Sequence, residues 1–162
     1  MLKRIVVLEP DFLQEETVTL LLERVFPNVH KVNFSVAVDL LKYYKEFTTD
    51  DIIITERRIP LLSTTEDTDE RIKEIQTLFP ETLDWDDRNG GEILVDCLRK
   101  KGITCPAIIY TTSGFDERLG SEGYVCDHQT VFCEKEDSFD NLILVIRTIA
   151  SSLIQVRTHP FL

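Results

Sequence analysis

Polar side chains that can do chemistry come directly after short apolar runs of this 162-residue sequence. Glu9 and Asp11 follow "RIVVL", Glu56 follows "DIIIT", Thr111 ends "AIIYT", and Lys135 comes soon after "TVFC". A carboxylate in such a place can bind a hard cation, and a lysine can meet it with a charge-assisted hydrogen bond. The pattern leaves open whether Glu56 is a working acid, an inactive imitation of one or an ordinary surface residue.

The elements that must position these residues alternate between strand and helix patterns. Four of the five predicted strands are almost wholly apolar, which is typical of strands buried on both faces of a parallel sheet. The sequence therefore predicts an α/β fold of the flavodoxin-like type, a five-stranded parallel sheet with helices on both faces. Because parallel strands end at one sheet edge, we expect Glu9, Glu56 and Lys135 to line one shared hollow.

The expected boundaries follow from capping residues, prolines and glycines. Strands are expected at 4–8, 29–34, 51–55, 105–112 and 130–134. Helices are expected from Phe12 to the stop at Pro27, from Ser35, across 90–102, and from a cap at Asp137 or Ser138. The last residues, 156–162, are expected to form a short C-terminal tail of a single domain that spans 1–162.

Residues 61–89 are longer and more acidic than a strand-to-helix connection requires, and we interpret them as an insertion after the third strand. Ile72, Ile75, Leu78 and Phe79 recur at helical spacing, which predicts an amphipathic helix of about two to three turns. The acidic residues lack the alternating ligands and the glycine of a calcium loop. A solvated segment that faces a partner is the preferred interpretation.

Composition excludes several classes of function. The formal net charge of −11 opposes binding to a phosphate backbone, so direct nucleic-acid binding is not expected. No apolar run reaches the roughly 18 to 20 residues of a membrane span, and the first residues do not resemble a cleaved leader. A cytoplasmic protein with reduced, packed cysteines is therefore expected.

The order of the motifs is similar to that of the receiver domain of bacterial response regulators. The resemblance rests on "VVLEPD", "IIITERRIP", "PAIIYTT" and "VFCEKE", and it covers nearly the whole chain apart from the insertion and the last residues. It implies an acidic pocket at the first strand end, with Glu9 and Asp11 flanking a magnesium-binding position. It also implies that Glu56 takes the phosphoacceptor place, Thr111 the switch hydroxyl, Phe132 the switch aromatic and Lys135 the lysine of the pocket.

Departures from that pattern point away from phosphoryl transfer. Glu56 stands in place of the phosphoacceptor aspartate, and its extra methylene moves the carboxylate by a distance that can cost on the order of 100-fold in rate. Pro10 stands in place of a second acidic residue, which removes an oxygen ligand that Mg²⁺ prefers. Glu136 and Thr112 also depart from the pattern. We therefore expect a pseudo-receiver pocket that is not phosphorylated, with at most a weak Mg²⁺ site at Glu9, Asp11 and Glu56, and no other cofactor.

Plainer interpretations remain beside these. Glu56 could be a solvated residue beside two arginines, Lys135 a surface lysine, Thr111 a packing residue and Phe132 part of the core. Zinc ligation is a weak alternative, because Cys126, His128 and Cys133, with Cys105 nearby, match no standard ligand spacing.

The preferred function is that of an atypical receiver-like module in signal transduction, which contacts a protein partner or a second copy of itself and is not an enzyme. With only a short tail after the last helix, no output domain is expected. One alternative is an Mg²⁺-dependent phosphoacceptor that uses Glu56 or a nearby carboxylate such as Asp11. Another is a flavodoxin-like small-molecule binder.

Overall fold

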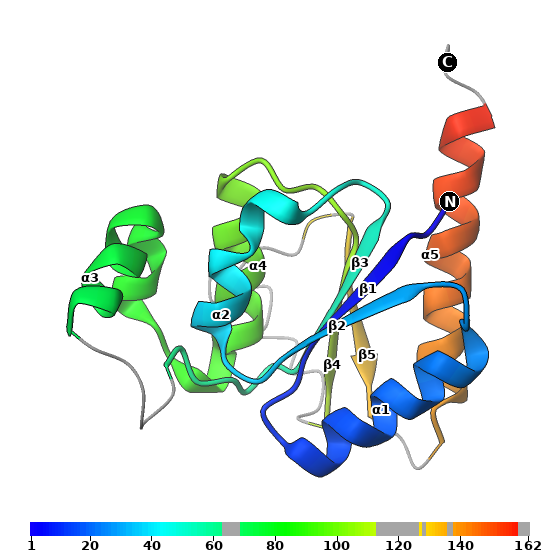
Figure 1. Ribbon diagram of the computed structural model, residues 1–162, viewed down its shortest axis with the longest axis horizontal. Helices are drawn as coiled ribbons and strands as arrows, with labels where there is room; N and C mark the ends of the chain where they lie inside the picture. The colour runs from blue at the N-terminus through cyan, green and yellow to red at the C-terminus, as the bar shows by residue number, and fades with distance from the viewer. Residues whose placement is uncertain (63–68, 113–126, 128, 136–137, 159–162) are drawn as a thin grey trace.

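The computed structural model describes residues 1–62, 69–112, 127, 129–135 and 138–158. The strands are β1 (Arg4–Leu8), β2 (His30–Phe34), β3 (Asp51–Thr55), β4 (Ala107–Thr111) and β5 (Thr130–Glu134). Within the described residues, strands alternate with helices from β1 to β4, and β5 is the next described element after β4 (Figure 1). The α-helices are α1 (Phe12–Val25), α2 (Ala37–Lys42), α3 (Asp69–Leu78), α4 (Gly90–Lys100) and α5 (Asp140–Thr158). Three 3₁₀ helices are η1 (Tyr44–Glu46), η2 (Pro80–Asp84) and η3 (Asp87–Asn89).

The sheet has the order β2-β1-β3-β4-β5, and every neighbouring pair is parallel. This is the flavodoxin-like order, so the predicted fold class is confirmed. The register pairs Leu8 with Thr55 and Thr111 with Glu134, which brings the carboxyl ends of β1, β3, β4 and β5 to one edge. The sequence places its acidic and basic strand-end residues at this edge.

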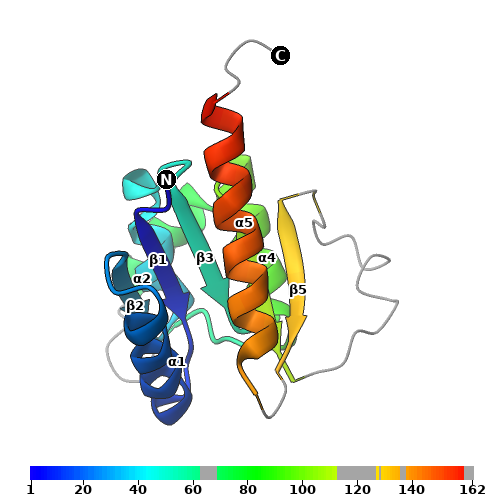
Figure 2. The ribbon, with the colours of Figure 1, turned by 90° about the vertical axis from the view of Figure 1, so that its right-hand side faces the viewer.

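Helices cover both faces of the sheet (Figure 2). Helices α1 and α5 pack their buried residues Val18, Leu22, Leu142 and Ile146 against one face. Helices α2 and α4 cover the other face, where their side chains join residues of β1, β3 and β4 in a second core cluster. All five side chains of both β3 and β4 are buried, which explains why these two strands have no polar alternation.

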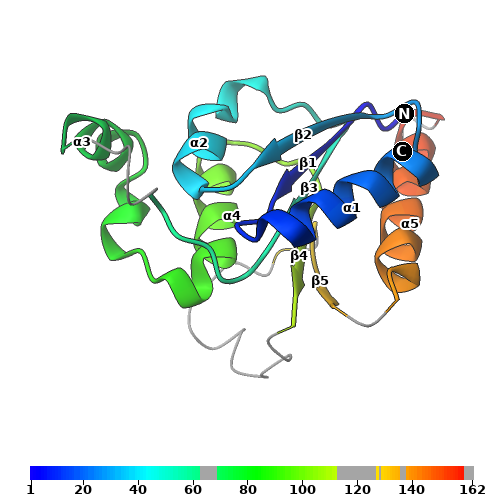
Figure 3. The same ribbon diagram turned by 60° about the horizontal axis from the view of Figure 1, so that its bottom comes forward.

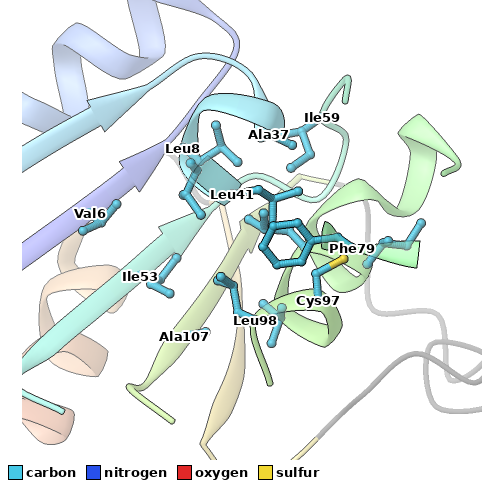
Figure 4. Close-up of a cluster of buried hydrophobic side chains, with 14 of the residues drawn as sticks. Val6, Leu8, Ala37, Leu41, Ile53, Ile59, Phe79, Cys97, Leu98 and Ala107 are labelled. Atoms are coloured by element: carbon cyan, nitrogen blue, oxygen red, sulfur yellow. The ribbon is translucent and has the colours of Figure 1, made fainter. Parts of the chain in front are cut away.

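The acidic segment between β3 and α4 contributes to the second core cluster. Ile75 of α3 is 1% exposed and Phe79 is fully buried, and Phe79 lies among Leu41, Ile59 and Cys97 (Figure 4). Helix α3 lies on the outside of α2 and α4, away from the sheet (Figure 3). The expected amphipathic helix is present, and it turns its acidic residues Asp69, Glu70 and Glu74 to solvent.

Several expected boundaries differ from the observed ones. Ser35 does not open the second helix, because Val36 is its N-cap residue and provides no side-chain hydrogen bond. Helix α5 begins at Asp140, whose amide donates to the Ser138 hydroxyl at 3.1 Å, while Asp137 lies outside the described residues. The same helix continues to Thr158, so residues 156–158 of the expected tail are helical.

A buried ion pair closes the amino end of the sheet. Arg4 donates from Nε to Oδ1 of Asp51 at 3.1 Å and from Nη2 to Oδ2 at 2.6 Å. The Thr48 amide donates to the same Asp51 Oδ2 at 2.7 Å, and Tyr43 accepts a further bond from Arg4. Asp51 is 1% exposed, so this bidentate pair is a structural clamp between β1, β3 and the η1 region.

Within the described part of the chain, no helix combines the length and the apolar character needed to cross a bilayer.

Candidate functional site

Backbone hydrogen bonds fix the three strand ends that form the site. The amide of Glu9 donates to the Phe34 carbonyl at 3.1 Å, and the amide of Glu56 donates to the Leu8 carbonyl at 2.9 Å. The amide of Lys135 donates to the Thr111 carbonyl at 2.8 Å. Each of these three residues therefore continues the hydrogen-bond pattern of the sheet by one step beyond the end of its strand.

Lys135 joins the acidic strand ends into one cluster. Its Nζ donates to Glu9 Oε2 at 2.8 Å, to Gln14 Oε1 at 2.7 Å and to Glu56 Oε2 in a short contact. The same ammonium lies 5.2 Å from the centroid of the Tyr110 ring, which is within the range of a cation–π contact. One cation is thus bound by two carboxylates, an amide oxygen and an aromatic face.

The cluster is mostly withdrawn from water. The side chains of Lys135, Glu9 and Glu56 are 9%, 7% and 11% exposed. Burial lowers the pKa of Lys135, but the hydrogen bonds and charges of Glu56 and Glu9 outweigh it, so the pKa lies above its ordinary value. The interpretations of Glu56 and Lys135 as solvated surface residues are therefore wrong.

The second oxygen of each carboxylate is held by backbone amides. Glu9 Oε1 accepts from the Asp11 amide at 3.1 Å, and Glu56 Oε1 accepts from the Arg57 amide at 2.7 Å. Asp11 Oδ1 accepts from the Gln14 amide at 3.1 Å, so this carboxylate caps α1. Both glutamates are thus oriented by contacts on two sides.

A buried ion pair supports the loop after Glu56. Arg57 turns away from Glu56 and donates to Glu92 Oε1 at 3.0 Å and to Asn89 Oδ1 at 2.9 Å. Helix α4 reaches this loop because Gly91 has no side chain: a Cβ there would lie 2.5 Å from the Glu56 carbonyl oxygen. The contact sets the position of the backbone that carries Glu56.

The cluster forms one wall of a cavity of about 330 Å³. The cavity is also lined by Pro10, Asp11, Arg58, Thr111 and Thr112. Thr111 is 3% exposed and Phe132 is half-buried on β5, while the loop after Thr112 lies outside the described residues. The structure therefore places Glu9, Asp11, Glu56, Thr111 and Lys135 around one hollow, and their functional roles stay predictions.

The residues present do not fit a magnesium ion, which the receiver resemblance implies. Mg²⁺ needs near-octahedral oxygens at about 2.0–2.1 Å, whereas the facing Oε2 atoms of Glu9 and Glu56 are bound to Lys135. Pro10 adds no oxygen ligand from its side chain. Among the residues that the structure describes, no group of three or more His, Cys, Asp or Glu side chains is arranged to hold a metal ion.

The zinc alternative falls partly on undescribed residues, since Cys126 and His128 lie outside them. Cys97, Cys105 and Cys133 are buried. Burial raises the pKa of Cys97 and of Cys105 to about 12, which disfavours the thiolate form that metals bind.

Sequence reasoning missed four contributors to the site. Gln14 lies one helical turn after Asp11, and Tyr110 immediately precedes the predicted Thr111, so their positions in the sequence offered a signal. Glu92 and Asn89 offered none, because an acid in the first turn of a helix is usually a solvated, dipole-stabilised residue.

The fold is similar to solved structures of receiver domains. The receiver domain of a Francisella response regulator is 16% identical, with a TM-score of 0.61, over 93% of this chain and 98% of its own. A receiver domain protein from Bacillus halodurans is 12% identical, with a TM-score of 0.60, over 92% and 97%. One from Clostridium thermocellum is 16% identical, with a TM-score of 0.56, over 96% and 99%.

No family model matches the sequence, and no curated protein matches it. At the identities of the solved structures, the similarity concerns the architecture. The chain therefore has the fold of response regulator receiver domains, with a carboxylate–lysine cluster at the carboxyl edge of its sheet.

Proposed function

We propose that this protein is a receiver-like module of signal transduction that binds a protein partner without being phosphorylated. The observation that carries the proposal is the contact of Lys135 with both Glu9 and Glu56 at the carboxyl edge of a receiver-type sheet. A carboxylate that is already paired on one oxygen and held by an amide on the other is a poor phosphoryl acceptor, because acceptance requires an oxygen placed in line with the donor.

The surface beside the pocket supports a binding role. Helix α1 exposes Phe12 and Leu13 at 72% and 71%, and Leu20, seven residues after Leu13, at 60%. Leu13 and Leu20 share one helix face. Leu13 also lines a second cavity with Tyr110 and Phe139, adjacent to Lys135. Exposed apolar side chains that share one face of a helix are candidates for a protein contact.

The experiment is incubation with a small acyl phosphate and Mg²⁺, followed by intact mass measurement. A receiver domain with its own aspartate serves as the positive control. We expect the mass of this protein to stay unchanged while the control gains a phosphoryl group. A gain that disappears in Glu56→Ala or Asp11→Ala would establish the alternative of a phosphoacceptor at the respective carboxylate.

The binding role requires its own measurement. Partners isolated from the native cell should bind the wild-type protein equally before and after acyl phosphate treatment. They should bind the Leu13→Ala, Leu20→Ala double variant more weakly, whereas Glu23→Gln on the same helix should leave binding unchanged. Binding that depends on the phosphoryl donor would contradict the proposal.

A flavodoxin-like small-molecule binder is less well supported. The cavity at the strand ends lies at the lower limit of the roughly 300–1,000 Å³ of ligand pockets. Charged side chains contribute to its lining, including Glu9, Glu56 and Lys135, whereas such pockets are mostly apolar.

A further inference from the structure

We infer that the ammonium group of Lys135 is the resident cation of the pocket and that it excludes divalent metal ions from it. The inference concerns the same pocket as the proposed function and rests on it only for the assignment of that pocket. The proposed function says that the pocket is not phosphorylated, and the inference adds which cation occupies it.

Three side-chain oxygens converge on Nζ of Lys135. Glu9 of the β1 end, Gln14 of α1 and Glu56 of the β3 end direct one oxygen each to this atom. An ammonium group has three donors, and all three are used here. Hard oxygens from three separate elements that converge on one point are the kind of donor set that a Ca²⁺ or Mg²⁺ ion would use.

Displacement of the Lys135 ammonium by a metal ion would break all of its contacts. An incoming ion would leave the Lys135 head without its two carboxylates, and the Tyr110 ring would lose its cation. The side chain is only 9% exposed, so its head would have to move out into solvent. A tethered ammonium also acts at a high effective concentration, which a free ion must overcome.

The oxygens around Nζ are spaced for an ammonium group. Nζ lies 2.8 Å from Glu9 Oε2 and 2.7 Å from Gln14 Oε1. These distances are only slightly longer than the roughly 2.3–2.6 Å between Ca²⁺ and its oxygen ligands. They are much longer than the roughly 2.0–2.1 Å between Mg²⁺ and its oxygen ligands. If the ammonium is removed by mutation, the vacated oxygens should therefore favour Ca²⁺ over Mg²⁺.

The test is titration of the wild-type protein and two variants with CaCl₂ and with MgCl₂, followed by calorimetry and thermal unfolding. Lys135→Ala removes the ammonium and leaves room for an ion, whereas Lys135→Met removes the charge but fills the space. We expect no saturable binding of either ion to wild type at millimolar concentrations. We expect saturable Ca²⁺ binding to Lys135→Ala, with weaker Mg²⁺ binding, and little binding to Lys135→Met.

Two further variants assign the ligands. Adding Glu9→Gln to Lys135→Ala should weaken Ca²⁺ binding by at least the roughly 10- to 100-fold that loss of an outer-shell partner costs. Lys101→Ala, a surface lysine, should behave as wild type. Saturable binding of either ion at the wild-type pocket would overturn the inference, as would a folded Lys135→Ala protein that gains no ion affinity.

The outcomes separate this inference from the proposed function. Metal binding to wild type without any phosphoryl gain overturns the resident cation alone. Phosphoryl gain by wild type overturns the proposed function, whether or not the metal titration is silent. Should Lys135→Ala fail to fold, the wild-type titration still decides whether the native pocket takes a divalent ion.

Discussion

The two ends of the sheet each hold a buried ion cluster, and the clusters differ in charge balance. At the amino end, one guanidinium faces one carboxylate: Arg4 binds both oxygens of Asp51. At the carboxyl end, one ammonium faces two carboxylates, Glu9 and Glu56, and a cavity opens beside them. The first cluster is neutral and held in a bidentate geometry, whereas the second has one more carboxylate than it has cations.

The two clusters also differ in the geometry of their cations. Arginine matches a carboxylate with a rigid planar fork, so the amino-end pair specifies one geometry. Lysine is a point charge on a flexible stem, so the carboxyl-end cluster depends on its neighbours for position. The amino-end pair therefore suits a structural role, and the carboxyl-end cluster suits a binding site.

The largest loss of unfolding free energy is expected from breaking the Arg4–Asp51 pair at the amino end of the sheet. Asp51→Asn leaves the Arg4 guanidinium without its carboxylate, and removal of one partner of a buried ion pair costs about 3–5 kcal/mol. Denaturant unfolding measures the loss. Asp39→Asn, which breaks a partly exposed pair with Arg71, should cost only about 0–1 kcal/mol. Equal losses of unfolding free energy in the two variants would show that the buried pair stabilises the fold no more than the partly exposed one.

The carboxyl-end cluster should respond to alkali, whereas the clamp should not. The folded-state pKa of Lys135 is raised above its ordinary value of 10.5, so its stabilisation is present below that pH and is lost as the pH rises through the folded-state pKa. Arg4 stays charged there, because its pKa is raised from an already high value.

Lys135→Gln measures this contribution. At neutral pH the variant should be less stable than wild type by about 1.5–3 kcal/mol, the usual value of a hydrogen bond to a charged group. The difference between the two proteins should shrink as the pH rises past the ordinary lysine pKa. A difference that stays constant with pH would contradict the pairing.

Helix α4 provides the next test, because its close approach positions Glu56. Gly91→Ala places a Cβ 2.5 Å from the Glu56 carbonyl oxygen and should cost about 1–3 kcal/mol by overpacking. Amide chemical shifts at Glu56 and Lys135 should change with it. Gly102→Ala strains a backbone with φ of 81° but meets no neighbouring atom, so it should destabilise without changing those signals.

The smallest loss of unfolding free energy is expected at Asp11, where two substitutions distinguish a helix cap from a metal ligand. Asp11→Ala removes the acceptor of the Gln14 amide and should cost about 1 kcal/mol. Asp11→Ser retains an N-cap oxygen, so its unfolding free energy should stay close to that of wild type. A stability loss in both variants that depends on added Mg²⁺ would instead indicate a ligand.

Much of the fold could be predicted because it is encoded locally. The apolar runs at Arg4–Leu8 and Asp51–Thr55 fall at the observed strands, since a buried parallel strand needs no partner to be recognised. The meeting of Glu9, Glu56 and Lys135 follows from the shared edge of parallel strands. The predicted start of α2 was wrong, because Ser35 has the residue type of a cap but lies outside the helix.

The rest of the site depends on packing that the sequence does not display. Glu92 is fully buried because Gly91 lets the first turn of α4 touch the loop after Glu56, and Arg57 then neutralises it. Nothing in the spacing of Arg57 and Glu92, 35 residues apart, indicates this pair. Tyr110 is different, because its place before Thr111 offered a signal, although its ring contacts Lys135 only once β4 and β5 are adjacent.

The most direct test is a double-mutant cycle on the stability of Glu56→Gln, Lys135→Met and the double variant in metal-free buffer. Direct contact between the two side chains predicts a coupling of at least about 1 kcal/mol, within the range of roughly 0.5–3 kcal/mol for residues that touch. Additive losses, equal within about 0.3–0.5 kcal/mol, would show that Lys135 does not hold Glu56 in solution.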